Sequence, residues 1–126
     1  MNIQISNMNR SQVEPVTAHY CASFFCRLRG LTFRRSLPDH WGLLLVQARD
    51  SRFDSAIHML GVWTDLAVFW IDSDMRVVDK RLARSWRPAY IPKQPARYVL
   101  EMAPDYLSNY AIGDQLVFEE LGPDRK

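Results

Sequence analysis

The fold is decided by residues 66–71, which read LAVFWI and contain no charged side chain. A strand with one wet face alternates between apolar and polar residues. An unbroken apolar run instead predicts a strand that is covered on both faces and is therefore central in its sheet. Residues 72–75, DSDM, supply turn-forming side chains, and residues 76–83 then alternate. The pattern predicts a hairpin of 66–71 with 76–83.

Outward from this hairpin, other segments predict further elements. The first eight residues alternate loosely, as a short edge strand would. Apolar residues between positions 17 and 31 recur at three- and four-residue spacing, which predicts a helix. A second, short helix is predicted to begin near Pro104 and to end before Gly113. The remaining predicted strands cover residues 42–47, 55–60, 97–102 and 115–120.

These elements predict an α+β fold in a single small domain, residues 1–126. We expect a curled, mainly antiparallel sheet, or a partly open barrel, of about six or seven short strands with two short helices. The composition agrees, because 48% apolar and 24% charged residues are ordinary values for a globular domain. Disordered, collagen-like and coiled-coil proteins are excluded on the same ground.

Location and redox state are also predicted from composition. No apolar run approaches the roughly 18 residues of a membrane span, and the first residues lack the pattern of a signal peptide, so we expect a soluble cytoplasmic protein. Cys21 and Cys26 are five positions apart, and on a helix they would face different directions. We therefore predict two buried free thiols.

Four spaced parts of the chain form a recognisable series. In order they are RGLTFRR at 29–35 with WGLLL at 41–45, IHMLG at 57–61, VFWID at 68–72, and WR at 86–87 with VLE at 99–101 and GD at 113–114. The series resembles the signature of a bacterial and archaeal family, domain of unknown function 192, over about residues 27–117. That family carries no established activity, so the resemblance implies a fold and not a reaction.

The chain departs from the family's pattern at two positions. Ala67 stands where the family's P-I-D step has an aspartate, so any chemistry of that carboxylate is missing here. Met75 stands where the family's D-x-D-G turn has glycine. A positive φ at a methionine costs roughly 1 kcal/mol, so we expect the turn at Met75 to be reshaped.

His58 is a candidate for acid–base or ligand chemistry, because histidine titrates close to neutral pH. Such a role needs a partner within hydrogen-bond reach, and Asp65 or Glu101 could provide it. The alternative is a strand histidine that is satisfied by a backbone carbonyl. We predict no metal site, since the three histidines lie in different segments, and no cofactor, since glycine-rich phosphate and dinucleotide motifs are missing from the sequence.

Seven bases and one acid lie between residues 76 and 97. Because Trp86 and Tyr90 lie among them, this stretch resembles a surface for single-stranded nucleic acid. The net charge of +2 is low for a protein of that kind. Two other uses are a pocket for a small anion, with Arg87 as a clamp and Trp86 as a wall, and a plain solvated strand face.

We therefore predict a module that binds an unknown small ligand or a protein partner in a groove near His58, Trp86, Arg87 and Glu101. It lacks strong catalytic machinery, and no catalytic residue is assigned. One alternative is a hydrolase that uses His58 with a carboxylate. Another is an accessory protein that binds nucleic acid through the basic stretch at 76–97. The sequence leaves open whether the protein is an enzyme, and in which oligomeric state it exists.

Overall fold

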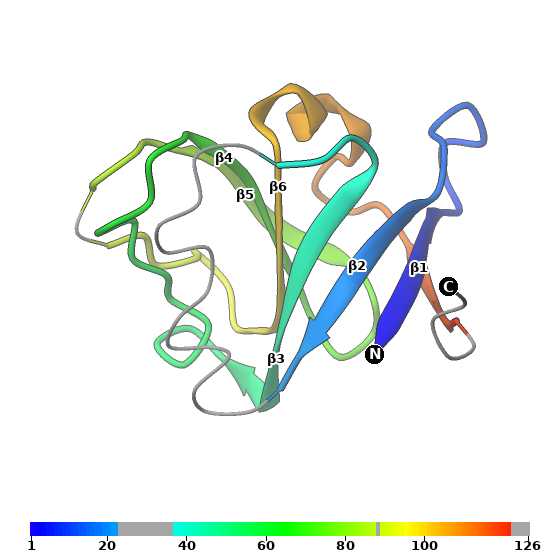
Figure 1. The fold of residues 1–126 in the computed structure, drawn as a ribbon. Helices are drawn as coiled ribbons and strands as arrows, with labels where there is room; N and C mark the ends of the chain where they lie inside the picture. The colour runs from blue at the N-terminus through cyan, green and yellow to red at the C-terminus, as the bar shows by residue number, and fades with distance from the viewer. Residues whose placement is uncertain (23–36, 88, 122–126) are drawn as a thin grey trace.

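The structure, a computed structural model, describes residues 1–22, 37–87 and 89–121. Its strands form one seven-stranded sheet in the order β5-β4-β6-β3-β2-β1-β7 (Figure 1). Neighbouring strands run antiparallel except for β2 and β3, which are parallel. The strands are β1 (Asn2–Asn7), β2 (Val16–Cys21), β3 (Trp41–Ser51), β4 (Leu66–Ile71), β5 (Val77–Ala83), β6 (Ala96–Met102) and β7 (Leu116–Glu120).

β4 lies between β5 and β6, and all six of its residues are buried. Ala67, Phe69 and Ile71 belong to a first apolar cluster, whereas Leu66, Val68 and Trp70 belong to a second. Successive side chains of a strand point to opposite faces, so both faces of β4 are covered by protein. The predicted central strand and its antiparallel hairpin with β5 are both confirmed.

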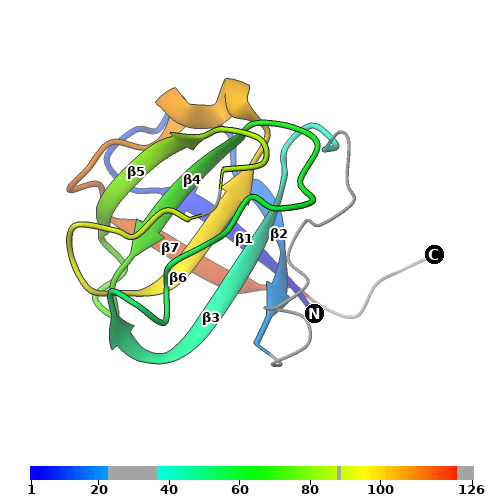
Figure 2. The same cartoon turned by 90° about the vertical axis from the view of Figure 1, so that its left-hand side faces the viewer.

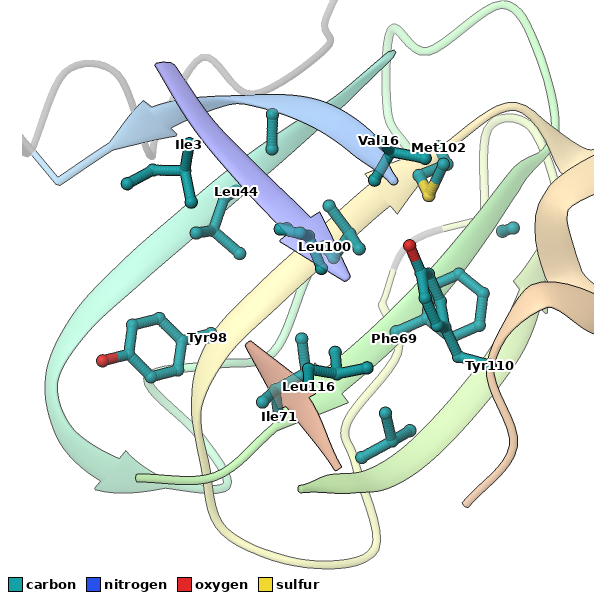
Figure 3. Packing of buried hydrophobic residues seen from close by; sticks show 14 of the residues in the cluster. Ile3, Val16, Leu44, Phe69, Ile71, Tyr98, Leu100, Met102, Tyr110 and Leu116 are labelled. Atoms are coloured by element: carbon teal, nitrogen blue, oxygen red, sulfur yellow. The ribbon is translucent and has the colours of Figure 1, made fainter. Parts of the chain in front are cut away.

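The first cluster fills the inner side of the curled sheet (Figure 3). Side chains from β1, β2, β3, β4, β6 and β7 point toward one another there. The ring of Tyr110 packs edge-on against Phe69, with 4.9 Å between the ring centroids. Aromatic pairs in this geometry stabilise a core beyond the area that they bury.

The two edges of the sheet meet at one end. The Val77 amide donates to the Asp114 carbonyl at 3.0 Å, and the Leu116 amide donates to the Met75 carbonyl at 2.8 Å. The 3-10 helix η1 (Pro104–Asn109) lies beside β4 and β5, and the Lys80 ammonium donates to the carbonyls of Leu107 and Tyr110. These bonds draw β5 toward β7 and account for the curl.

The second cluster lies on the other side of the sheet. Two long loops, at residues 52–65 and 84–95, cross this side of the sheet (Figure 2). Ile57, Met59 and Val62 of the first loop are buried against strand residues. The indole N–H of Trp70 donates to the Ser55 carbonyl at 2.8 Å, which fixes this loop to β4. The loops are therefore a second layer of the fold, and they carry the surface described below.

The predicted α+β class is wrong in its balance, because the described residues are mostly β. Residues 17–21, predicted to begin a helix, lie in β2, where they pair in parallel with β3. The rest of that predicted helix lies outside the described residues. The second predicted helix is present as η1, which is of the 3-10 type.

Three smaller expectations also need correction. Residues 55–60 form no strand, because their only β pairing is an isolated bridge between Ile57 and Tyr90. β1 is a strand as predicted, but it lies between β2 and β7 instead of at an edge. Cys21 is disulfide-bonded and not a free thiol. The helical geometry behind that prediction does not apply to a residue in β2, and Cys26 lies outside the described residues.

The turn at Met75 is not reshaped, because this residue takes the positive φ, 65°, that a glycine would take. Its side chain packs against the first cluster, and its carbonyl accepts the amide of Leu116. Apolar packing and a main-chain bond to β7 thus offset a backbone strain of roughly 1 kcal/mol.

Candidate binding surface

The two long loops are joined to each other by main-chain hydrogen bonds. Ile57 and Tyr90 exchange both of their bonds, at 3.0 and 2.9 Å. The Met59 amide donates to the Arg87 carbonyl, and the Trp86 amide donates to the Met59 carbonyl, each at 2.9 Å. Because Ile57 and Met59 turn inward to the second cluster, the residues between and after them are left on the outside.

Three large apolar side chains lie exposed where the loops meet. Trp63 and Trp86 are 51% and 49% exposed, and their rings pack edge to face with 5.3 Å between centroids. Leu60, next to Met59 in the chain, is 50% exposed. His58 and Arg87 are also exposed and flank these residues in the sequence. We call Leu60, Trp63 and Trp86, together with His58 and Arg87, the tryptophan surface.

Trp86 is held in a backbone conformation that tryptophan rarely adopts. Its φ is 67°, in the left-handed region that favours glycine. For a bulky residue this conformation costs of order 1 kcal/mol or more and persists only where the surroundings impose it. Here the imposing groups are the carbonyl of Met59 and, one residue later, the bond between Arg87 and Arg84.

Asp65 ties the two loops together beside this surface. Its carboxylate accepts the Ser85 amide at 2.8 Å and the Arg84 guanidinium at 3.1 Å. The Ser85 amide, and then the Arg84 side chain, hold the pKa of Asp65 below its usual value. The Ser85 hydroxyl donates to the Val62 carbonyl at 2.6 Å. The scaffold of the tryptophan surface is thus fixed by charged and main-chain groups.

Glu101 is the one predicted site residue that is buried and not exposed. It is on β6 between Leu43 of β3 and Val68 of β4, and it is buried. Its Oε1 atom finds no hydrogen-bond partner among the residues that the structure describes. Desolvation by burial raises the pKa of Glu101 to about 7. The carboxyl group is therefore partly protonated at neutral pH.

The structure does not pair His58 with a carboxylate. Its imidazole is exposed and makes no hydrogen bond to the described part of the chain. Asp65 is engaged by Arg84 and Ser85, and Glu101 is enclosed by the second cluster and its neighbours on β3 and β4. Within the described residues, His58 therefore neither pairs with a carboxylate nor binds a backbone carbonyl, which were the two alternatives predicted from the sequence.

Most bases of the stretch at 76–97 are committed to contacts within the protein. Lys80 binds carbonyls next to β5, Arg84 binds Asp65, and the guanidinium of Arg81 lies 5.4 Å from the centre of the Tyr90 ring. Arg76 and Arg97 donate to the carbonyls of Gly113 and Gln47. Within the described residues, the side chains of Arg87 and Lys93 are left without such a partner.

Trp63 and Leu60 were missed by the sequence interpretation. Trp63 lies in a loop without periodicity, and only its contact with Trp86 gives it significance. Within residues 1–22, 37–87 and 89–121, no group of three or more His, Cys, Asp or Glu could hold a metal ion. Among the same residues, no helix is long and apolar enough to cross a membrane.

The family comparison gives one decisive match. The profile of domain of unknown function 192, described as "Uncharacterized ACR", fits residues 5–118. The chain belongs to this family. The match begins well before residue 27, so β1 and β2 are part of the family's domain. The family is of unknown function, and membership assigns no activity.

Several archaeal relatives carry the name UPF0127 protein. That of Thermococcus gammatolerans is 40% identical over 79 residues, which are 63% of this chain and 50% of that protein. That of Thermococcus sibiricus is 35% identical over 100 residues, 77% of this chain and 62% of that protein. The chain thus spans about half to three-fifths of these relatives. A Pyrococcus furiosus protein is 25% identical over 117 residues, 91% of this chain and 97% of its own length.

Two crystal structures share the fold. A chain from Sinorhizobium meliloti 1021, provisionally described as a transcription regulator, has a TM-score of 0.79 at 18% identity and covers 93% of this chain and 92% of its own. A protein of unknown function from Novosphingobium aromaticivorans has a TM-score of 0.75 at 16% identity, over 92% of this chain and 83% of its own. At these identities the likeness shows the fold alone.

Proposed function

We propose that the chain is a binding module that recognises a ligand or partner through the tryptophan surface, without chemical conversion. The observation that carries the proposal is the pair of half-exposed indoles, Trp63 and Trp86, held edge to face on a fixed backbone. Exposed apolar side chains that cluster mark binding sites more often than isolated ones do.

A protein is the partner class that this composition favours. Tryptophan and arginine are the residues most enriched among the energetic centres of protein interfaces. The strained φ of Trp86 supports the same interpretation, because strain of this kind concentrates at functional sites. A backbone fixed before binding also lowers the entropy that is lost on association.

The other candidate functions find less support. A hydrolase would need His58 to reach a carboxylate, and the described residues offer it none. Binding of nucleic acid would need free bases, whereas five of the seven in the stretch at 76–97 are engaged within the protein. The single domain over residues 1–126 and the cytoplasmic location remain predictions. The Cys21 disulfide makes cell fractionation worthwhile, because disulfides are rare in the cytosol.

A thermal-shift screen tests the proposed function. The panel holds acidic, basic and apolar peptides, organic anions, nucleotides and a single-stranded oligonucleotide. A ligand at 100 times its Kd adds about 2.7 kcal/mol to the free energy of unfolding, which is several degrees in Tm. We expect a hit that is lost in both Trp63→Ala and Trp86→Ala. Ile112→Ala is the control, because Ile112 is also a large exposed apolar residue, at 60%, but lies between η1 and β7. A hit that all three variants retain would overturn the proposal.

A further inference from the structure

We propose that the occupant of the tryptophan surface is a protein segment that presents a carboxylate beside an aromatic or large apolar side chain, and that Arg87 anchors the carboxylate. The inference rests on the proposed function and specifies the chemistry of the partner.

The joined loops carry a net positive charge. The joined segments 57–65 and 84–90 contain two arginines and one aspartate. Asp65 and Arg84 neutralise each other through a contact of 3.1 Å. The positive charge of Arg87 is left over, and His58 adds no negative charge to offset it. A partner that covers Arg87 removes water from its charge, which is unfavourable unless the partner supplies an anion. The surface therefore favours an anionic partner.

Arg87 combines a fixed backbone with an unpartnered side chain. Its backbone is fixed on both sides, because its amide donates to the Arg84 carbonyl at 3.3 Å and its carbonyl accepts the Met59 amide at 2.9 Å. Its side chain, in contrast, is exposed and has no partner in the described structure. A guanidinium on a fixed backbone can bind a carboxylate through two parallel hydrogen bonds.

Exposed apolar side chains accompany Arg87 where the two loops are joined. Trp86 is the adjacent residue, and its ring contacts that of Trp63. Leu60 is half-exposed and follows Met59, whose main chain bonds to Trp86 and Arg87. An aromatic or large apolar side chain can cover these groups while an anion next to it reaches Arg87. The same two features recur in the centres of protein interfaces, where aromatic anchors lie beside an arginine.

Three small peptides separate the elements of this chemistry. Acetyl-Ala-Phe has a free terminal carboxylate, acetyl-Ala-Phe-amide has none, and acetyl-Asp-Phe-amide has a carboxylate only on its side chain. Binding is followed by the indole N–H signals of the four tryptophans in heteronuclear NMR, each assigned with a Trp→Phe variant. The terminal and side-chain sources of the carboxylate are distinguished by which of the two anionic peptides binds more tightly.

We expect at least one anionic peptide to shift the signals of Trp63 and Trp86 and to bind about tenfold more tightly than the neutral amide. Arg87→Gln should remove this difference. Lys93→Gln, which removes the other uncommitted base of the stretch, should retain it. Equal affinity of all three peptides for the wild type would overturn the role of Arg87 and leave the proposed function standing. Retention of the difference in Arg87→Gln would also overturn it. If no peptide shifts the signals of Trp63 and Trp86, the assigned partner chemistry is wrong. The thermal-shift screen then tests the surface independently.

Discussion

The main-chain carbonyl of Met59 accepts the amide of Trp86, although the side chain of Met59 is fully buried in the second cluster. One residue thus joins the core to the exposed indoles. Met59→Ala should lower the free energy of unfolding by about 2 to 5 kcal/mol, the range for losing a buried methionine side chain. Urea unfolding followed by far-UV circular dichroism measures the change. The adjacent exposed Leu60→Ala should remain within about 0.5 kcal/mol of the wild type. Equal effects of the two substitutions would contradict the assignment of Met59 to the core.

Glu101 predicts a specific pH dependence of stability. Its pKa in the folded state, about 7, lies above its ordinary value of 4.5. The folded state therefore holds this proton more tightly than the unfolded state does. The contribution of the protonated carboxyl group to stability is complete below pH 4.5 and is lost as the pH rises through about 7. The loss is of order 3 kcal/mol.

Glu101→Gln removes the titration and should flatten the pH profile between pH 5 and 8. Unfolding free energies at both pH values, in wild type and variant, check this. The comparison uses the slope with pH, because the amide changes the absolute stability as well. Identical slopes in the two proteins would show that the Glu101 carboxyl group is already ionised in the folded state at pH 5.

Tyr110 carries a buried hydroxyl that has no hydrogen-bond partner among the described residues. Burial of an unpaired hydroxyl is unfavourable, so Tyr110→Phe should raise the free energy of unfolding by about 1 kcal/mol. The ring contact with Phe69 remains in the variant. Tyr106→Phe is the control, since the Tyr106 hydroxyl accepts the His40 amide at 2.8 Å and its loss should be mildly destabilising. A loss of stability in Tyr110→Phe would reveal a partner for that hydroxyl.

The strain at Met75 can be measured by comparing two substitutions at the same position. Both Met75→Gly and Met75→Ala lose the packing of the side chain, but alanine keeps a Cβ at the φ of 65°. The glycine variant should therefore be more stable than the alanine variant by about 1 kcal/mol. At Ser73, in the same turn but outside the left-handed region, alanine should be at least as stable as glycine. Thermal unfolding of the four variants gives the two differences.

The central part of the fold was predictable because its determinants are local. The unbroken apolar run of β4 and the alternation of β5 predict their own pairing. β2 was not predictable, because Tyr20 and Cys21 continue into apolar residues at helical spacing while the strand forms through parallel pairing with β3. Such long-range pairing leaves little trace in a local pattern.

Three of the predicted site residues share one region of the structure, although not the predicted one. His58, Trp86 and Arg87 were chosen for their motif positions, and they lie where two loops are joined and not on a strand. Glu101 was placed with them because it lies at a motif position and could pair with His58, yet it is buried on β6. Trp63 was missed because its significance depends on a ring contact between loops that are distant in the sequence.

The claim that the tryptophan surface binds a protein segment with a carboxylate beside an aromatic side chain is tested most directly by an NMR titration with acetyl-Ala-Phe and acetyl-Asp-Phe-amide. The four indole N–H signals serve as internal reporters. We predict that the better-binding peptide moves the signals of Trp63 and Trp86, while those of the buried Trp70 and the half-buried Trp41 stay in place. Movement of the Trp41 signal with those of Trp63 and Trp86 unchanged would contradict the account.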